Sequence, residues 1–391
     1  MVEMWRPITL TTLTTAAGFM GLYFAAYMPP FKYFGLFTAL GVCVAWLYSL
    51  IVLPAVMSLL KTKVHPRLAR KIRTEGHDRF ARSMVVLGGW VQSHAKAVVT
   101  LSVVTVVLGT LAASQLKVDE DRIATFHPSE DLYQADQVIN QNFDGSNYLD
   151  IIVETEEAEG IFEPQVLQKM QALQHYAETL PWVQGSTSVV DYLKQMNRAL
   201  NEGDPQQYRL PTDKDLIAQY FLLYSASGEP TDFEEEIDYD YRLANIRVSL
   251  NNGAFADNKV VVEQLNDYLH SNFNDHNLKA TLSGRVNLNY HWIKDLGDSH
   301  FTGMAIAMLL SWLVSALLFR SMLAGIYALT PVATSILLVY SAMVTLNIPL
   351  GIGTSMFAAV AIGLGVDFAI HTIDKLRALY PQSGDIRATL Q

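Results

Sequence analysis

An acidic side chain inside an otherwise uncharged apolar stretch is the residue of this sequence best suited to chemistry. Asp367 is the only formally charged residue between Ser321 and Ile373. A carboxylate surrounded by hydrocarbon costs several kcal/mol unless it is protonated, paired or facing a wet cavity. We therefore expect Asp367 to load and release protons. The alternative is a structural carboxylate that is hydrogen-bonded between helices.

Three further side chains are candidates for the same proton relay. His371 follows Asp367 by four residues and lies on the same helical face, where it either shares the proton or only marks the end of the apolar span. Thr14 and Thr15 belong to a threonine-rich run near the N-terminus. Threonines in membrane helices usually bond to their own carbonyls or join helices, whereas a sharper interpretation has Thr14 or Thr15 facing a carboxylate on a neighbouring helix. The sequence leaves these alternatives open.

Two glycines near Asp367 have a simpler role. Gly363 and Gly365 are small enough to let a neighbouring helix approach closely. We predict that both serve helix packing.

Motifs of enzymes and cofactor sites are absent from the sequence. It has no G-x-x-x-x-G-K-S/T phosphate-binding loop, no H-E-x-x-H zinc motif and no G-x-S-x-G nucleophile elbow. Its single cysteine, Cys43, excludes a disulfide framework and a cysteine-based metal site. We therefore expect no enzymatic activity, no catalytic residue, no cofactor, no metal and no nucleic-acid partner.

The elements that must position these side chains are membrane helices. A span needs about 20 mostly apolar residues to cross ~30 Å of hydrocarbon. Half of the residues are hydrophobic, and the mean hydropathy is +0.18. Six stretches are long and apolar enough: Ile8–Ala26, Phe34–Leu60, Val98–Leu116, Phe301–Phe319, Leu323–Leu346 and Gly351–Ile373. The predicted fold class is an α-helical membrane bundle with an inserted α/β domain.

Charge and hydropathy divide the chain into six regions. These are a helix pair (1–60), a basic cytoplasmic linker (61–96), a third membrane helix (97–116), an extracytoplasmic domain (117–297), three membrane helices (298–374) and a cytoplasmic tail (375–391). From Lys117 to Gly297 there are 31 acidic and 13 basic residues, against 7 and 15 in the remainder. The positive-inside rule places the basic segment Lys61–Arg82 in the cytoplasm. We therefore expect a multi-pass protein of the plasma (inner) membrane, with its acidic domain on the outer side.

The inserted domain alternates strand and helix patterns. Runs rich in Ile, Val and Leu predict strands at Tyr148–Glu154, Leu243–Leu250 and Leu278–Gly284. Helical patterns cover Pro164–Leu180, Asp213–Ser225 and Ala256–Phe273. Strands separated by such helices favour βαβ-type units. The acidic stretch Glu229–Asp240 is expected to be a solvated loop, with a cation site or a partner contact as the alternative.

Two groups of membrane motifs resemble one known family. The first group is Arg6–Phe19 (RPITLTTLTTAAGF), Phe34-Gly35-Leu36, Leu40-Gly41 and Leu53-Pro54-Ala55; the second is Thr330-Pro331, Ile348-Pro349-Leu350 and Gly363–Phe368 (GLGVDF). They resemble helices five and six and helices eight to ten of resistance-nodulation-division (RND) transporters. The similarity is to the MMPL-like branch, which is related to proteins with sterol-sensing domains.

The resemblance implies a function and a set of partners. Members of this family are proton-driven exporters with twelve membrane helices, in which a carboxylate on helix four faces one on helix ten. Asp367 matches the helix-ten carboxylate, and the residue after it is Phe368 where many relatives have Tyr. The implied partners are protons, membrane lipids and a hydrophobic or lipid-like substrate. The short inserted domain, similar to a porter domain, implies no docking to an outer-membrane channel.

The resemblance also concerns the extent of the chain. It spans helices five to ten, so we expect an internal fragment that is inactive without the missing half of the same transporter. The leading function is part of an exporter driven by the proton motive force. A lipid sensor or receptor on the sterol-sensing scaffold, and an accessory subunit of protein secretion, are the alternatives.

Overall fold

The computed structural model describes residues 5–26, 28–60, 79–227 and 235–383. It forms two compact units, one made of Met1–Lys117 with Asp295–Gln391 and the other of Val118–Lys294. We call them the helical unit and the inserted domain. Most of the predicted basic segment Lys61–Arg82 lies outside the described residues.

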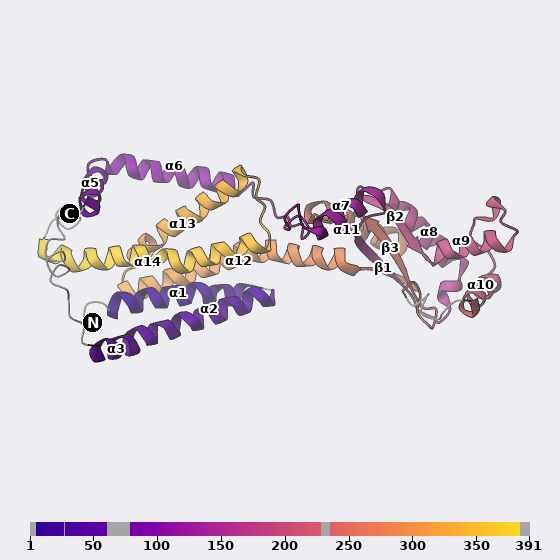
Figure 1. Cartoon of the computed structure of the whole chain (residues 1–391), viewed down its shortest axis with the longest axis horizontal. Helices are drawn as coiled ribbons and strands as arrows, with labels where there is room; N and C mark the ends of the chain where they lie inside the picture. The colour runs from indigo at the N-terminus through magenta and orange to yellow at the C-terminus, as the bar shows by residue number, and fades with distance from the viewer. Residues whose placement is uncertain (1–4, 27, 61–78, 228–234, 384–391) are drawn as a thin grey trace. The chain divides into compact units, whose positions relative to one another are not determined.

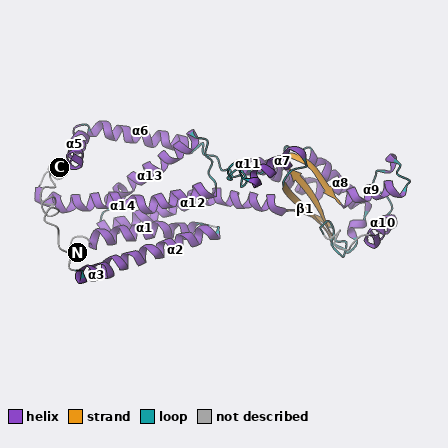
Figure 2. Ribbon diagram, viewed as in Figure 1, coloured by secondary structure: helices purple, strands orange, loops and turns teal. Residues whose placement is uncertain are grey.

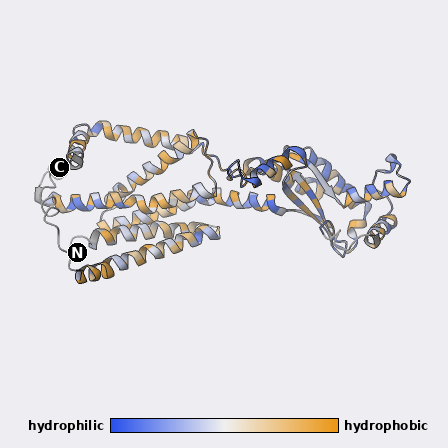
Figure 3. Ribbon diagram, in the orientation of Figure 1, coloured by the Kyte–Doolittle hydropathy of each residue, from blue (hydrophilic) through white to orange (hydrophobic). Residues whose placement is uncertain are grey.

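Six helices of the described part are long and apolar enough to cross a membrane. Figure 3 shows hydrophobic residues along these helices. They are α1 (Trp5–Ala25), α2 (Pro29–Leu47) with its continuation α3 (Leu53–Leu59), α6 (Ala95–Ala113), α12 (Gly284–Phe319), α13 (Met322–Thr345) and α14 (Ile352–Ser383). A short helix, α5 (Arg79–Ser93), precedes α6 inside the predicted linker.

Local sequence sets the ends of these helices. Pro29 and Pro30 start α2, where a missing N–H costs no hydrogen bond. Arg320 adopts a left-handed φ of 48° after α12, and the Ser321 side chain then accepts a hydrogen bond from the Ala324 N–H to cap α13. A π-helical turn over Tyr48–Val52 joins α2 to α3 just before Pro54. Proline has no backbone N–H to donate to the helical hydrogen bonds.

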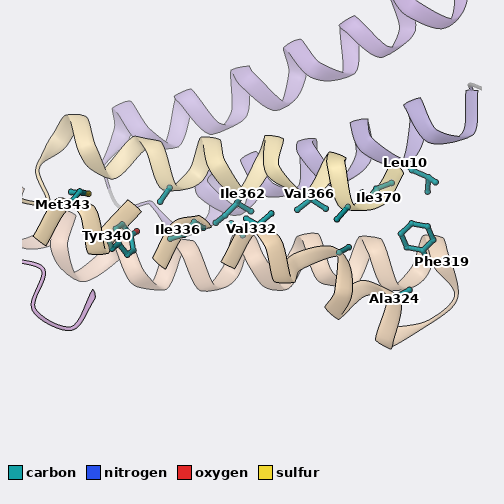
Figure 4. Close-up of a cluster of buried hydrophobic side chains, with 14 residues drawn as sticks. Leu10, Phe319, Ala324, Val332, Ile336, Tyr340, Met343, Ile362, Val366 and Ile370 are labelled. Atoms are coloured by element: carbon teal, nitrogen blue, oxygen red, sulfur yellow. The ribbon is translucent and has the colours of Figure 1, made fainter. Parts of the chain in front are cut away.

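The helical unit has one apolar core, shown in Figure 4. α14 packs against α1 on one side and against α13 on another, and α13 also packs against α6. Ala328, Ile362, Val366 and Ile370 are fully buried in this core. In water, burial of apolar surface contributes about 25 cal/mol per Å² to stability. Within a membrane, close packing of the helices contributes more than burial does.

The inserted domain contains a four-stranded sheet with the order β2-β3-β1-β4, in which all neighbours are antiparallel. The strands, drawn in orange in Figure 2, are β1 (Asn147–Thr155), β2 (Val183–Ser188), β3 (Leu243–Leu250) and β4 (Leu278–Ser283). β1 and β2 are parallel to each other with β3 between them, and β3 and β4 are related in the same way across β1. The domain thus consists of two interleaved split βαβ units. Among the predicted strands, Leu243–Leu250 and Leu278–Gly284 form a βαβ unit, with an antiparallel strand between them. Tyr148–Glu154 and Leu243–Leu250 do not, because they are antiparallel neighbours and the parallel partner of β1 is the unpredicted strand β2.

One face of this sheet forms the core of the domain. Leu149, Ile151 and Val153 alternate along β1 and are fully buried. α8 (Pro164–Glu178) contacts β2 and β3, and the π-helical turn that ends α11 (Phe255–Tyr268) contacts β4. Figure 1 shows these helices beside the sheet.

Several elements differ from the sequence prediction. β2, α7 (Asp131–Asn142) and α9 (Val189–Leu200) were not predicted, and α10 (Lys214–Ser227) was. β2 is a polar strand (VQGSTS), so it lacks the apolar alternation on which strand prediction rests. The solvated-loop prediction is wrong for Glu236 and Ile237 of the acidic stretch, which are buried. Ile237 forms a β-bridge with Ala244, and this bridge draws the end of the stretch onto the sheet.

Candidate proton-carrying site

Asp367 lies half-buried on α14, beside α1. The Thr15 Oγ1 atom of α1 is 3.2 Å from Asp367 Oδ1 and 2.7 Å from the backbone oxygen of Gly363. A hydroxyl has one hydrogen but can also accept. Thr15 can therefore donate to an ionised Asp367, or donate to Gly363 and accept from a protonated Asp367. Both protonation states of the carboxyl group are thus provided with a partner.

Small residues bring α1 close enough for this contact. A Cβ atom added to Gly18 would lie 3.3 Å from the Cα atom of Gly363, and one added to Gly363 would lie 2.9 Å from a ring carbon of Phe19. Such distances leave no room for larger residues at this helix crossing. Gly365 faces a different neighbour, since its added Cβ would lie 2.9 Å from a methyl group of Val332 on α13. The two glycines predicted for packing therefore lie against α1 and α13, respectively.

The structure separates the two threonine candidates. Thr14 is fully buried, but its hydroxyl donates to the backbone oxygens of Leu10 and Thr11 within α1, at 3.1 and 2.9 Å. Thr15 is the residue brought to Asp367. His371 is exposed on α14 one turn beyond Asp367, and no hydrogen bond joins it to Asp367 among those of the described residues.

A second buried polar pair lies in the helical unit and escaped the sequence analysis. His300 of α12 and Tyr340 of α13 are buried, and the distance from His300 Nε2 to the Tyr340 hydroxyl is 2.6 Å. His300 also lines a small cavity with Ser299 and Ser355. His300 stands directly before the predicted span Phe301–Phe319, where a histidine is ordinary. The sequence pattern of one helix does not reveal its contacts with another, so the contact between His300 and Tyr340, forty residues away, was not predicted.

Apolar side chains surround the next turns of α14. Val366 and Ile370 flank Asp367 in sequence and belong to the core drawn in Figure 4. Within the part of the chain that the structure describes, no three histidine, cysteine, aspartate or glutamate side chains form a group that could hold a metal ion. The arrangement lets the Thr15 hydroxyl act as a donor or an acceptor toward the Asp367 carboxyl group, beside an apolar core.

Comparison with known proteins supports the resemblance at one end of the chain. The family model described as the MMPL family matches residues 1–104. This segment includes α1 with Thr15, but not α14 with Asp367. No curated protein matches the chain.

Proposed function

We propose, from its MMPL-family segment and the site beside that segment, that this chain is part of a proton-driven exporter of hydrophobic or lipid-like molecules. The observation that carries the proposal is the contact between Asp367 on α14 and Thr15 on α1. A carboxyl group inside a membrane bundle costs free energy, and such groups usually mark a proton or ion pathway. Because the Thr15 hydroxyl can bond to Asp367 in both protonation states, proton exchange is the function that we assign to this carboxyl group.

The proton motive force supplies the energy in this proposal. One elementary charge crossing the membrane is worth ~2.3 kcal/mol per 100 mV. Loading a proton on Asp367 reverses the direction of its hydrogen bond with Thr15, because the carboxyl group becomes the donor. This reversal changes the contact between α14 and α1, two helices that touch through Gly18 and Gly363. Their relative movement would couple proton passage to transport.

We place the protein in the plasma (inner) membrane, with its inserted domain on the extracytoplasmic side. The acidic balance of that domain supports this orientation, and so do the basic residues that concentrate in the rest of the chain. The resemblance to RND transporters pairs the helix-ten carboxylate with a second one on helix four. We propose that another half of the transporter supplies that carboxylate, and that export requires both.

The decisive experiment replaces Asp367 by Asn in the transporter assembled with its second half. Asn is nearly isosteric with Asp but cannot exchange a proton, so proton-coupled export in reconstituted liposomes should fall to the background rate. Thr15→Val should retain the carboxyl group and lower the rate only in part. Proton influx is measured with an entrapped pH dye, and export with a labelled lipid-like substrate.

Asp374→Asn is the matched control, because it makes the same chemical change seven residues further along α14. This variant should export at the unmodified rate. Export that persists unchanged in Asp367→Asn would refute the proposed role of Asp367. Lipid binding without any proton-dependent flux in the unmodified protein would favour the sensor alternative.

A further inference from the structure

A groove in the inserted domain lies outside the proton-carrying site. Its volume is about 540 Å³, and it lies where the loop after α7 meets the sheet face opposite the core. The groove is open on one side. Residues from α7's end, β1, β3 and the acidic stretch line it, among them Phe143, Asp144, Tyr148, Glu236, Arg247 and Ser249.

Two aromatic side chains line the groove. Phe143 is 68% exposed and Tyr148 is 43% exposed. Phe143 offers an apolar surface to a ligand, whereas the Tyr148 ring already has the Arg247 guanidinium group 5.8 Å from its centroid.

Two carboxyl groups, those of Asp144 and Glu236, also line the groove. Arg247 is the basic residue there, and it already donates to Asp150 and Glu235, at 3.3 Å in each case. Asp144 lies at the end of α7, and Glu236 is only 8% exposed. The Oε2 atom of Glu236 has no hydrogen-bond partner among the described residues. Two carboxyl groups thus already pair with the guanidinium group, two more line the groove, and the Oε2 atom of Glu236 lacks a donor.

We propose that this groove binds an amphipathic molecule with a positively charged amine headgroup. The ammonium group would lie against Glu236 and Asp144, and the apolar part would lie on Phe143 and Tyr148. An ammonium group brings three hydrogen-bond donors and no acceptor. It therefore supplies a positive charge beside the carboxyl groups and a donor for the unpaired Oε2 atom of Glu236. An anionic headgroup would meet the excess of carboxylates, and a neutral one would leave that excess uncompensated.

The identification of this ligand as a substrate of the exporter rests on the proposed function. Its binding to the groove does not require transport and can be measured separately. Glu236 belongs to the acidic stretch Glu229–Asp240, for which a cation site was the alternative to a solvated loop. Within that stretch, the buried carboxyl group of Glu236 distinguishes a site from a merely acidic surface.

The test measures binding of three indole probes to the full chain in detergent micelles, by microscale thermophoresis without a proton gradient. Tryptamine carries an ammonium group, tryptophol a hydroxyl and indole-3-propionate a carboxylate on the same ring. Tryptamine should bind most tightly. Glu236→Gln should weaken tryptamine binding roughly 10- to 100-fold, because the carboxylate charge that strengthens its hydrogen bond to the ammonium group is lost. Phe143→Ser should weaken the binding of all three probes, because each packs its ring on Phe143.

Glu156→Gln provides the control, since it makes the same charge change at an exposed residue that does not line the groove. Tryptamine binding should be unchanged in this variant and in Asp367→Asn. Equal affinities for the three probes would overturn the proposal, and so would equal effects of Glu236→Gln and Glu156→Gln. Selective tryptamine binding by a protein that shows no transport would refute the proposed function and leave the groove assignment standing.

Discussion

Glu236 is a carboxyl group in an environment that suits its neutral form. Burial raises the pKa of Glu236, and Glu235 and Asp150 raise it further, whereas the charge of Arg247 lowers it. The folded domain therefore holds this proton at pH values where the unfolded chain has released it. Because the folded state binds more protons in that window, stability falls as the pH rises from about 4.5 through the raised pKa.

Replacing Glu236 by Gln removes this pH dependence. At pH 7 the variant should be more stable than the unmodified protein, by on the order of 1 kcal/mol, and the difference should shrink toward pH 4. Thermal unfolding of the inserted domain, followed by near-UV circular dichroism across this pH range, measures the effect. Glu156→Gln should show no such trend, and a Glu236→Gln variant that is less stable at pH 7 would contradict the prediction.

Close helix contacts determine how α1 sits in the helical unit. A Cβ atom added to Gly21 would lie 2.5 Å from the Cα atom of Ala307 on α12, which is a backbone atom and cannot rotate away. Gly41 on α2 is also helical, but nothing lies within 4 Å of an added Cβ. An alanine normally stabilises a helix relative to glycine by up to about 1 kcal/mol.

The same substitution should therefore have opposite effects at these two glycines. Gly21→Ala should destabilise the protein by about 1–3 kcal/mol, because α1 and α12 must move apart, and Gly41→Ala should leave it unchanged or slightly more stable. Thermal unfolding of both variants in the same detergent measures the difference. Similar melting temperatures would mean that α1 and α12 do not approach so closely.

The proposed topology of the whole molecule rests on the three membrane helices that precede the inserted domain and on the distribution of charge. With Cys43 replaced by Ser, single cysteines at Thr74 and Gln206 should react with a membrane-impermeant maleimide from opposite sides. Gln206 lies on an exposed turn of the inserted domain, and Thr74 lies outside the described residues. Labelling of Gln206 alone in intact cells, and of Thr74 only after permeabilisation, is the expected result. Labelling of both positions in intact cells would overturn the proposed orientation.

The sequence by itself determined the features that depend on one segment at a time. Apolar length located the helices, and the run Leu243–Leu250, rich in Leu, Ile and Val, located β3 residue for residue, because hydropathy and period are local properties. Asp367 was visible as a lone charge for the same reason. Only the tertiary structure decided which threonine meets it, since neighbouring residues on a helix point about 100° apart and the rotation of α1 is set by Gly18, Gly21 and their contacts. The pairing of His300 with Tyr340 and the burial of Glu236 likewise depend on segments far apart in the sequence, which no local pattern records.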